Sequence, residues 1–117
     1  MEVKAITRNV RMSAQKMREV VRQIQGMNAV QAQAVLAVVP RKSARFVAKT
    51  LKSALANAED LKTNKPEYSG LKVEFLRVKE AVAQTASTLK RMIPKARGSS
   101  GPILKRNCHI KIVLSDN

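Results

Sequence analysis

The chain has 117 residues and a mass of 12.9 kDa, so we expect one compact domain that spans residues 1–117. Its 23 Lys and Arg against 8 Asp and Glu give a formal net charge of +15, which favours a polyanionic partner. No run approaches the roughly 18 apolar residues of a membrane span, and the amino terminus is charged, so we expect neither membrane insertion nor secretion. The single cysteine, Cys108, excludes an internal disulfide and agrees with a reducing compartment.

Two helices are predicted first along the chain. Residues 14–24 place apolar side chains at helical spacing, with Ser13 as the expected N-cap and Gly26 ending the helix. A second, shorter helix is expected over residues 29–38, with Asn28 as its cap.

The third predicted helix, from Arg41 to Leu61, has the clearest pattern. One face is apolar and consists of Ala44, Val47, Ala48, Leu51, Leu55 and Ala58. The opposite side has a basic stripe of Lys42, Arg45, Lys49 and Lys52. Such a stripe is consistent with a solvated face and with direct contact to RNA, and the pattern leaves both open.

The second half of the chain changes to a period of two, which is typical of strands. Apolar residues alternate with polar ones over Leu71–Phe75 and again over Ile110–Leu114, and residues 3–8 could form a third strand. Together these elements predict an α+β fold in which three helices pack on a small antiparallel three-stranded sheet. The globular body would comprise residues 1–83 and 110–117.

The intervening residues 84–109 contain no apolar row that could join a core. Their polar turn around Ser99 predicts a long protruding β-hairpin. Counted from Val82 to Gly98, one arm has 17 residues, so at about 3.3 Å per residue it could reach roughly 50 Å if fully extended. A basic loop that never orders is the alternative, because Pro94 and Pro102 both interrupt strand pairing.

The positive charge is concentrated in tracts without acidic residues. There is no Asp or Glu between Glu19 and Glu59, or between Glu80 and Asp116. The hairpin's cations are Lys90, Arg91, Lys95, Arg97, Lys105 and Arg106. It contains no aromatic residue on which bases could stack, so the pattern favours contact with phosphates and the shape of folded RNA.

Nothing in the sequence indicates catalysis, a metal site or a cofactor. Cys108 and His109 are neighbours in a predicted strand, so their side chains would point to opposite faces and could not form a catalytic pair. There is no second histidine or cysteine, and the carboxylates are scattered. We therefore expect no enzyme and no small-molecule substrate, and we expect His109 to bind RNA or to pack at the hairpin base.

Four stretches of the sequence are similar to one known family. Residues 90–98 read KRMIPKARG and residues 103–110 read ILKRNCHI, while residues 11–18 read RMSAQKMR and residues 53–59 read SALANAE. In order and spacing these stretches resemble the bacterial large-subunit ribosomal protein L22 family, and the likeness covers nearly the whole chain. The chain departs from the family's pattern where Ser99 and Ser100 follow the tip glycine, a position at which the family often has an arginine.

The resemblance implies a cytoplasmic structural constituent of the large ribosomal subunit that binds 23S rRNA and other large-subunit proteins. Its hairpin would line the nascent-peptide exit tunnel and meet the nascent polypeptide. The RNA-binding residues implied are Arg8, Arg11, Lys16, Arg18, Lys90, Arg91, Lys95, Arg97, Lys105, Arg106 and His109. The implied tunnel tip comprises Met92, Ile93, Pro94, Gly98, Ser99, Ser100 and Gly101.

A second class of function fits part of the pattern. DNA-architectural proteins grip a duplex with a basic β-arm and insert an apolar wedge between bases. Met92, Ile93 or Ile103 could serve as that wedge.

Overall fold

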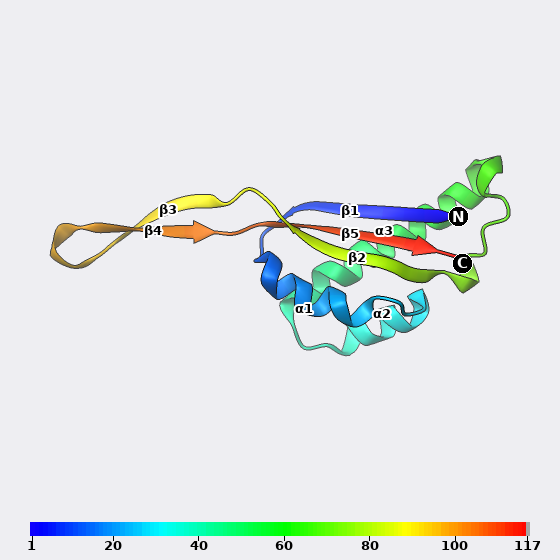
Figure 1. The fold of residues 1–117 in the computed structure, drawn as a ribbon, viewed down its shortest axis with the longest axis horizontal. Helices are drawn as coiled ribbons and strands as arrows, with labels where there is room; N and C mark the ends of the chain where they lie inside the picture. The colour runs from blue at the N-terminus through cyan, green and yellow to red at the C-terminus, as the bar shows by residue number, and fades with distance from the viewer. Residues whose placement is uncertain (117) are drawn as a thin grey trace.

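The computed structural model describes residues 1–116, which form a body of helices and sheet with a narrow two-stranded ribbon running out of it (Figure 1). The molecule measures 67 × 28 × 16 Å. The elements are, in chain order, β1 (Glu2–Val10), α1 (Ala14–Ile24), α2 (Ala29–Val38), α3 (Lys42–Asn64), η1 (Pro66–Tyr68), η2 (Val73–Phe75), β2 (Arg77–Thr85), β3 (Leu89–Pro94), η3 (Ala96–Gly98), β4 (Ser100–Lys105) and β5 (Cys108–Ser115).

The first two helices confirm their predictions. α1 begins after Ser13, although the Ser13 hydroxyl makes no capping hydrogen bond. It ends before Gly26, whose φ of 80° is a left-handed conformation that glycine adopts without strain. α2 has the predicted bounds, and the Asn28 side chain accepts a hydrogen bond of 3.0 Å from the Val30 N–H, as an N-cap should.

α3 also forms as predicted but ends at Asn64 rather than Leu61. On its inner face Ala44, Val47, Leu51 and Ala58 are buried, whereas Ala48 and Leu55 are only half-buried. Ser43, Thr50 and Ala54 are buried as well. An apolar pattern cannot find Thr50, which is buried because its hydroxyl donates to the Phe46 carbonyl and pairs with the Thr7 hydroxyl at 2.7 Å.

The body's sheet has the order β1-β5-β2, with both outer strands antiparallel to β5. This confirms the α+β class with three helices and an antiparallel three-stranded sheet. Two of the three predicted strands are also confirmed, at residues 3–8 and 110–114.

The strand predicted over Leu71–Phe75 is wrong. Val73–Phe75 forms the 3₁₀ turn η2, which leaves Phe75 59% exposed, and the third strand is β2, from Arg77 to Thr85. A bulge in β2 explains why the sequence pattern missed the strand at Arg77–Thr85, because the register shifts between Val78 and Glu80. The inward residues are therefore Val78, Ala81 and Ala83, and their spacing breaks the period of two that the sequence pattern requires.

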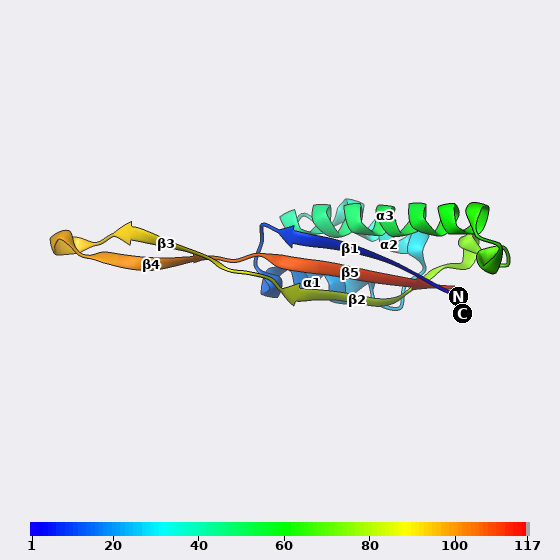
Figure 2. The same ribbon diagram turned by 90° about the horizontal axis from the view of Figure 1, so that it is seen from above.

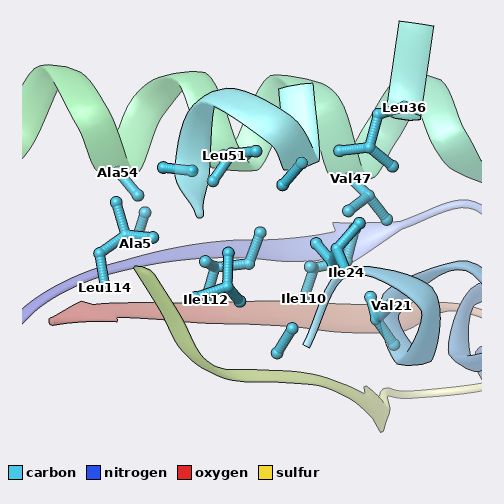
Figure 3. Packing of buried hydrophobic residues seen from close by; sticks show 14 of the residues in the cluster. Ala5, Val21, Ile24, Leu36, Val47, Leu51, Ala54, Ile110, Ile112 and Leu114 are labelled. Carbon is cyan, nitrogen blue, oxygen red and sulfur yellow. The ribbon is translucent and has the colours of Figure 1, made fainter. Parts of the chain in front are cut away.

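The hydrophobic core lies between the sheet and the helices α1 and α3 (Figure 3). From the central strand, Ile110 lies by Ile24 of α1, Ile112 lies under Leu51 of α3, and Leu114 lies by Ala54 of α3. The side chains of Ile24, Leu51, Ile110, Ile112 and Leu114 all have 0% exposure. Burial of these aliphatic side chains, each contributing about 1.5–3 kcal/mol, is the main stabilisation of a core without tryptophan.

The ribbon is a paired hairpin, with Leu89 opposite Lys105 and Pro94 opposite Ser100. The body's sheet ladder ends at Thr85 opposite Cys108, so we define the arm as residues 86–107. Figure 2 shows the arm continuing the long axis of the sheet without touching a helix along most of its length. Pro94 and Pro102 are both accommodated within the ladder, each at a strand position on this isolated two-stranded ribbon, where one side of every strand is unpaired.

Candidate nucleic-acid interface

The net charge of the molecule is confined to the arm and to the part of the body defined by residues 8–52. Residues 8–52 and 86–107 carry 16 basic side chains and one carboxylate, Glu19. The remaining residues carry seven basic and seven acidic side chains, so this remainder is electrically neutral. Glu19 itself forms an ion pair with Arg41. These two segments therefore carry the whole positive net charge of the molecule.

The six cationic side chains of the arm are exposed to solvent. Lys90, Arg91, Lys95, Arg97, Lys105 and Arg106 are all exposed, and no salt bridge involves any of them among the described residues. Arg91 donates through Nη1 to the neighbouring Lys90 carbonyl at 2.8 Å. Because exposed cations on a thin ribbon repel one another, the arm is electrostatically suited to a surface that supplies negative charge.

The tip of the arm is a defined turn over Lys95–Ser99. The Lys95 N–H donates to the Ser99 carbonyl at 2.7 Å, and the Ser99 hydroxyl donates to the Ala96 carbonyl at 2.8 Å. Arg97 (φ 60°) and Gly98 (φ 71°) both adopt left-handed conformations that reverse the chain. The turn therefore presents the Arg97 side chain at the extreme end of the molecule.

The residues assigned to the tip by resemblance lie in two places. Gly98 and Ser99 belong to the turn itself. The last rungs of the ladder contain Met92, Ile93, Pro94, Ser100 and Gly101. A Cβ atom on Gly101 would lie only 2.8 Å from the Lys95 Cε. The lysine side chain therefore packs over the glycine at this end of the ribbon.

The body cations assigned by resemblance have different environments. Arg8 and Lys16 are exposed. Arg11 is exposed, and its Nη1 donates to the Arg106 carbonyl at 2.7 Å, joining the β1–α1 turn to the base of the arm. Arg18 is half-buried and donates from Nε to the Ala83 carbonyl at 3.0 Å, a contact that holds α1 against β2.

His109 lies at the base of the arm, on β5. Its Nδ1 accepts a hydrogen bond of 3.0 Å from the Asn9 N–H, so the ring proton sits on Nε2. Asn9 has a φ of 55° at the point where the β1–β5 register shifts. The half-buried ring thus fixes the end of β1.

Sequence reasoning did not group Lys42 with the cations at the arm base. The structure places this first residue of α3 in one groove with Arg11, Lys16 and Arg106. The sequence pattern placed Lys42 on the outer stripe of α3 with Arg45, Lys49 and Lys52, which are all exposed. Only knowledge of how α3 packs beside α1 could have assigned it to the groove.

Residues 1–116 contain no cluster of side chains that could hold a metal ion. No group of three or more His, Cys, Asp or Glu side chains in this range could hold a metal ion, and no helix in it is long and apolar enough to cross a membrane. Cys108 has 0% exposure, and its burial raises the pKa of the thiol, so the thiolate is disfavoured. The fold and the distribution of charge define a basic α+β protein with a protruding β-hairpin.

Residues 5–115 match the family described as ribosomal protein L22p/L17e. Similar curated proteins, each named large ribosomal subunit protein uL22, come from Opitutus terrae (48% identical), Akkermansia muciniphila (46%) and Methylacidiphilum infernorum (44%). Each alignment covers 99% of this chain and 96% or 97% of the relative. The chain belongs to the ribosomal protein L22p/L17e family, and it is a structural protein of the large ribosomal subunit, not an enzyme.

Proposed function

We propose that the protein binds 23S rRNA through the basic part of its body and that its arm extends along rRNA to line the nascent-peptide exit tunnel. The observation that carries this proposal is the confinement of all net charge to residues 8–52 and 86–107, next to a neutral remainder. A polyanion would contact the charged segments and leave the neutral remainder free.

The mode of RNA recognition follows from the side chains on the arm. Lysines and arginines neutralise phosphates, whereas sequence reading of single strands uses aromatic platforms. The aromatic residues of the chain are Phe46, Tyr68 and Phe75, all in the body. The arm would therefore recognise the backbone and shape of folded RNA.

At the tip, the arm offers a mixed surface to a passing polypeptide. Met92 is 67% exposed and Ile93 is 36% exposed, next to the basic turn at Lys95 and Arg97. Exposed apolar side chains on a thin ribbon are unfavourably hydrated and are stabilised by contact with another surface. This end of the arm therefore suits the wall of a narrow channel. Contacts with other large-subunit proteins would involve the neutral remainder of the body, where charge does not favour RNA.

A DNA-architectural function lacks the apolar wedge at the end of the arm. The end turn is polar and basic, from Lys95 to Ser99, whereas Met92, Ile93 and Ile103 lie further back in the ladder. Minor-groove wedges unstack bases by inserting an apolar side chain at the leading point. Sedimentation of a cell lysate separates the two functions, because a ribosomal protein migrates with the large subunit and a nucleoid protein does not.

The rRNA proposal is tested by removing charge from the arm while preserving its shape. One variant replaces Lys90, Arg91, Lys105 and Arg106 by glutamine, and a matched control replaces the exposed Lys62, Lys65, Lys72 and Arg77 of the neutral remainder. At 0.1 M salt, we expect the arm variant to lose at least about tenfold more affinity for a 23S rRNA transcript than the control variant loses. Equal losses would contradict the proposal.

The tunnel proposal is tested in translating ribosomes. A photo-crosslinking amino acid is placed at Ala96 in the tip turn, and in a control at Lys62 on α3. With stalled nascent chains, we expect crosslinks to the nascent polypeptide from residue 96 and none from residue 62. Crosslinks from residue 96 to rRNA alone would show that the tip is buried in RNA away from the tunnel.

A further inference from the structure

The arm joins the body through a narrow waist. The body ladder ends at Thr85 opposite Cys108, and the arm ladder begins at Leu89 opposite Lys105. Between them, the Ala86 N–H donates to the Asn107 carbonyl at 3.1 Å, and the Asn107 amide donates to the Ser87 carbonyl at 3.0 Å. The Arg11 bond to the Arg106 carbonyl is a third tie between body and arm. Three such hydrogen bonds at the junction between two separate sheets leave the direction of the arm weakly fixed.

A basic groove lies beside this waist. Its volume is about 420 Å³, and it separates the base of the arm from α1 and α3. The lining residues are Arg11, Met12, Ser13, Lys16, Lys42, Leu104 and Arg106. They come from the β1–α1 turn, from both helices and from the arm, so a molecule bound in the groove would touch the body and the arm at once.

The groove is positively charged without internal compensation. Four of its seven lining residues are cations, and no carboxylate is among them. The nearest acid in the adjoining depression is Glu19, which is paired with Arg41. Arg11 uses Nη1 for the Arg106 carbonyl, which leaves further guanidinium N–H donors for an anion. Mutual repulsion of four cations is relieved when an anion enters.

We propose that this groove binds consecutive phosphates of an RNA strand and that the bound strand fixes the direction of the arm relative to the body. The inference rests on the proposed rRNA binding and adds to it a location and a mechanical role. A phosphodiester backbone fits because it supplies one negative charge per nucleotide along a line, so that successive phosphates reach Lys16 and Lys42 on the body side and Arg106 on the arm side. Arm and body are then tied together by the ligand, not by the waist alone.

The experiment measures the direction of the arm directly. Spin labels are placed at Ala96→Cys in the tip and Ser53→Cys on α3, both exposed positions, while the native Cys108 is fully buried. We expect a broad distance distribution in the free protein and a narrow one with a 23S rRNA transcript. In the groove variant Lys16→Gln/Lys42→Gln, the distance distribution should stay broad with RNA bound. In the control Lys62→Gln/Lys65→Gln, it should narrow as in the wild type.

Binding measurements supply an independent readout. The groove variant should reduce the slope of log affinity against log salt by about 2, since each phosphate contact contributes roughly one unit, and the control should leave the slope unchanged. The inference is overturned if RNA narrows the distance distribution of the groove variant as it does that of the control, or if the groove variant keeps the wild-type slope of log affinity against log salt. Failure of the wild type to bind the transcript would instead overturn the proposed rRNA binding.

Discussion

Lys49 and Leu51 lie close together on α3 but face different surroundings. Leu51 has 0% exposure and packs in the core, while Lys49 is exposed on the basic side. We expect Leu51→Ala to lower the free energy of unfolding by about 2–5 kcal/mol, because it removes buried methyl groups and leaves a cavity. Lys49→Ala should change it by at most about 0.5 kcal/mol. Urea unfolding of both variants checks this, and equal effects would mean that the buried face of α3 is misassigned.

Gly26 provides a second test at the residue scale. Its φ of 80° ends α1, and nothing lies within 4 Å of where a Cβ would be, so the backbone alone disfavours a side chain. We expect Gly26→Ala to destabilise the fold by about 1–2 kcal/mol through left-handed strain. Gly70→Ala is the control, because its Cβ would meet only the Met1 side chain at 3.7 Å and its φ lies outside the left-handed region. A thermal or urea melt in which both variants match would contradict the role of Gly26.

At the scale of elements, the sequence predicted the parts whose patterns are local. α2 has its predicted bounds because Asn28 provides an N-cap that can be recognised from neighbouring residues. β2 was placed too early because the bulge after Val78 changes which residues face the core, and a bulge depends on the partner strand. For the same reason Lys42 was not linked to Arg106, since their proximity depends on the packing of α3 beside the arm.

The arm is the element whose removal the fold should tolerate. None of residues 86–107 belongs to the hydrophobic core cluster, whose members closest to the arm are Ala83 and Cys108. We expect a protein in which Leu89–Leu104 is replaced by a short glycine-containing turn to unfold cooperatively at nearly the wild-type urea midpoint. It should retain part of its rRNA affinity through Lys16 and Arg11 on the body.

The proposed tunnel location predicts that the same shortened protein, incorporated into large subunits, alters the tunnel wall without preventing assembly. Changed sensitivity to tunnel-binding inhibitors is the readout, with ribosomes carrying the full-length protein as the control. A shortened protein that circular dichroism finds unfolded would contradict the division between body and arm.

At the scale of the whole molecule, shape and charge reinforce each other. A protein 67 Å long and 16 Å thin has a large surface for its core, and the arm contributes surface without burial. Of the net charge of +15, six units lie on the arm, where surface is largest relative to volume, and nine lie on residues 8–52 of the body. The arrangement is unfavourable for the isolated protein, since like charges repel, and becomes favourable when a polyanion surrounds the arm. The free arm should therefore be the most mobile part of the molecule, with amide exchange faster than in α3.

Salt dependence measures how much of the binding free energy comes from this electrostatic match. Of the 16 basic residues in the charged region, about six to ten would meet phosphates, since some, like Arg18, hold the protein together. Each contact releases counterions from the RNA, so log affinity for a 23S rRNA transcript should fall against log salt with a slope of about −4 to −9. Titrations between 50 and 300 mM salt, with tRNA as competitor, check this range. A slope shallower than about −2 would mean that apolar or hydrogen-bonded contacts dominate, and would contradict a function based on the distribution of charge.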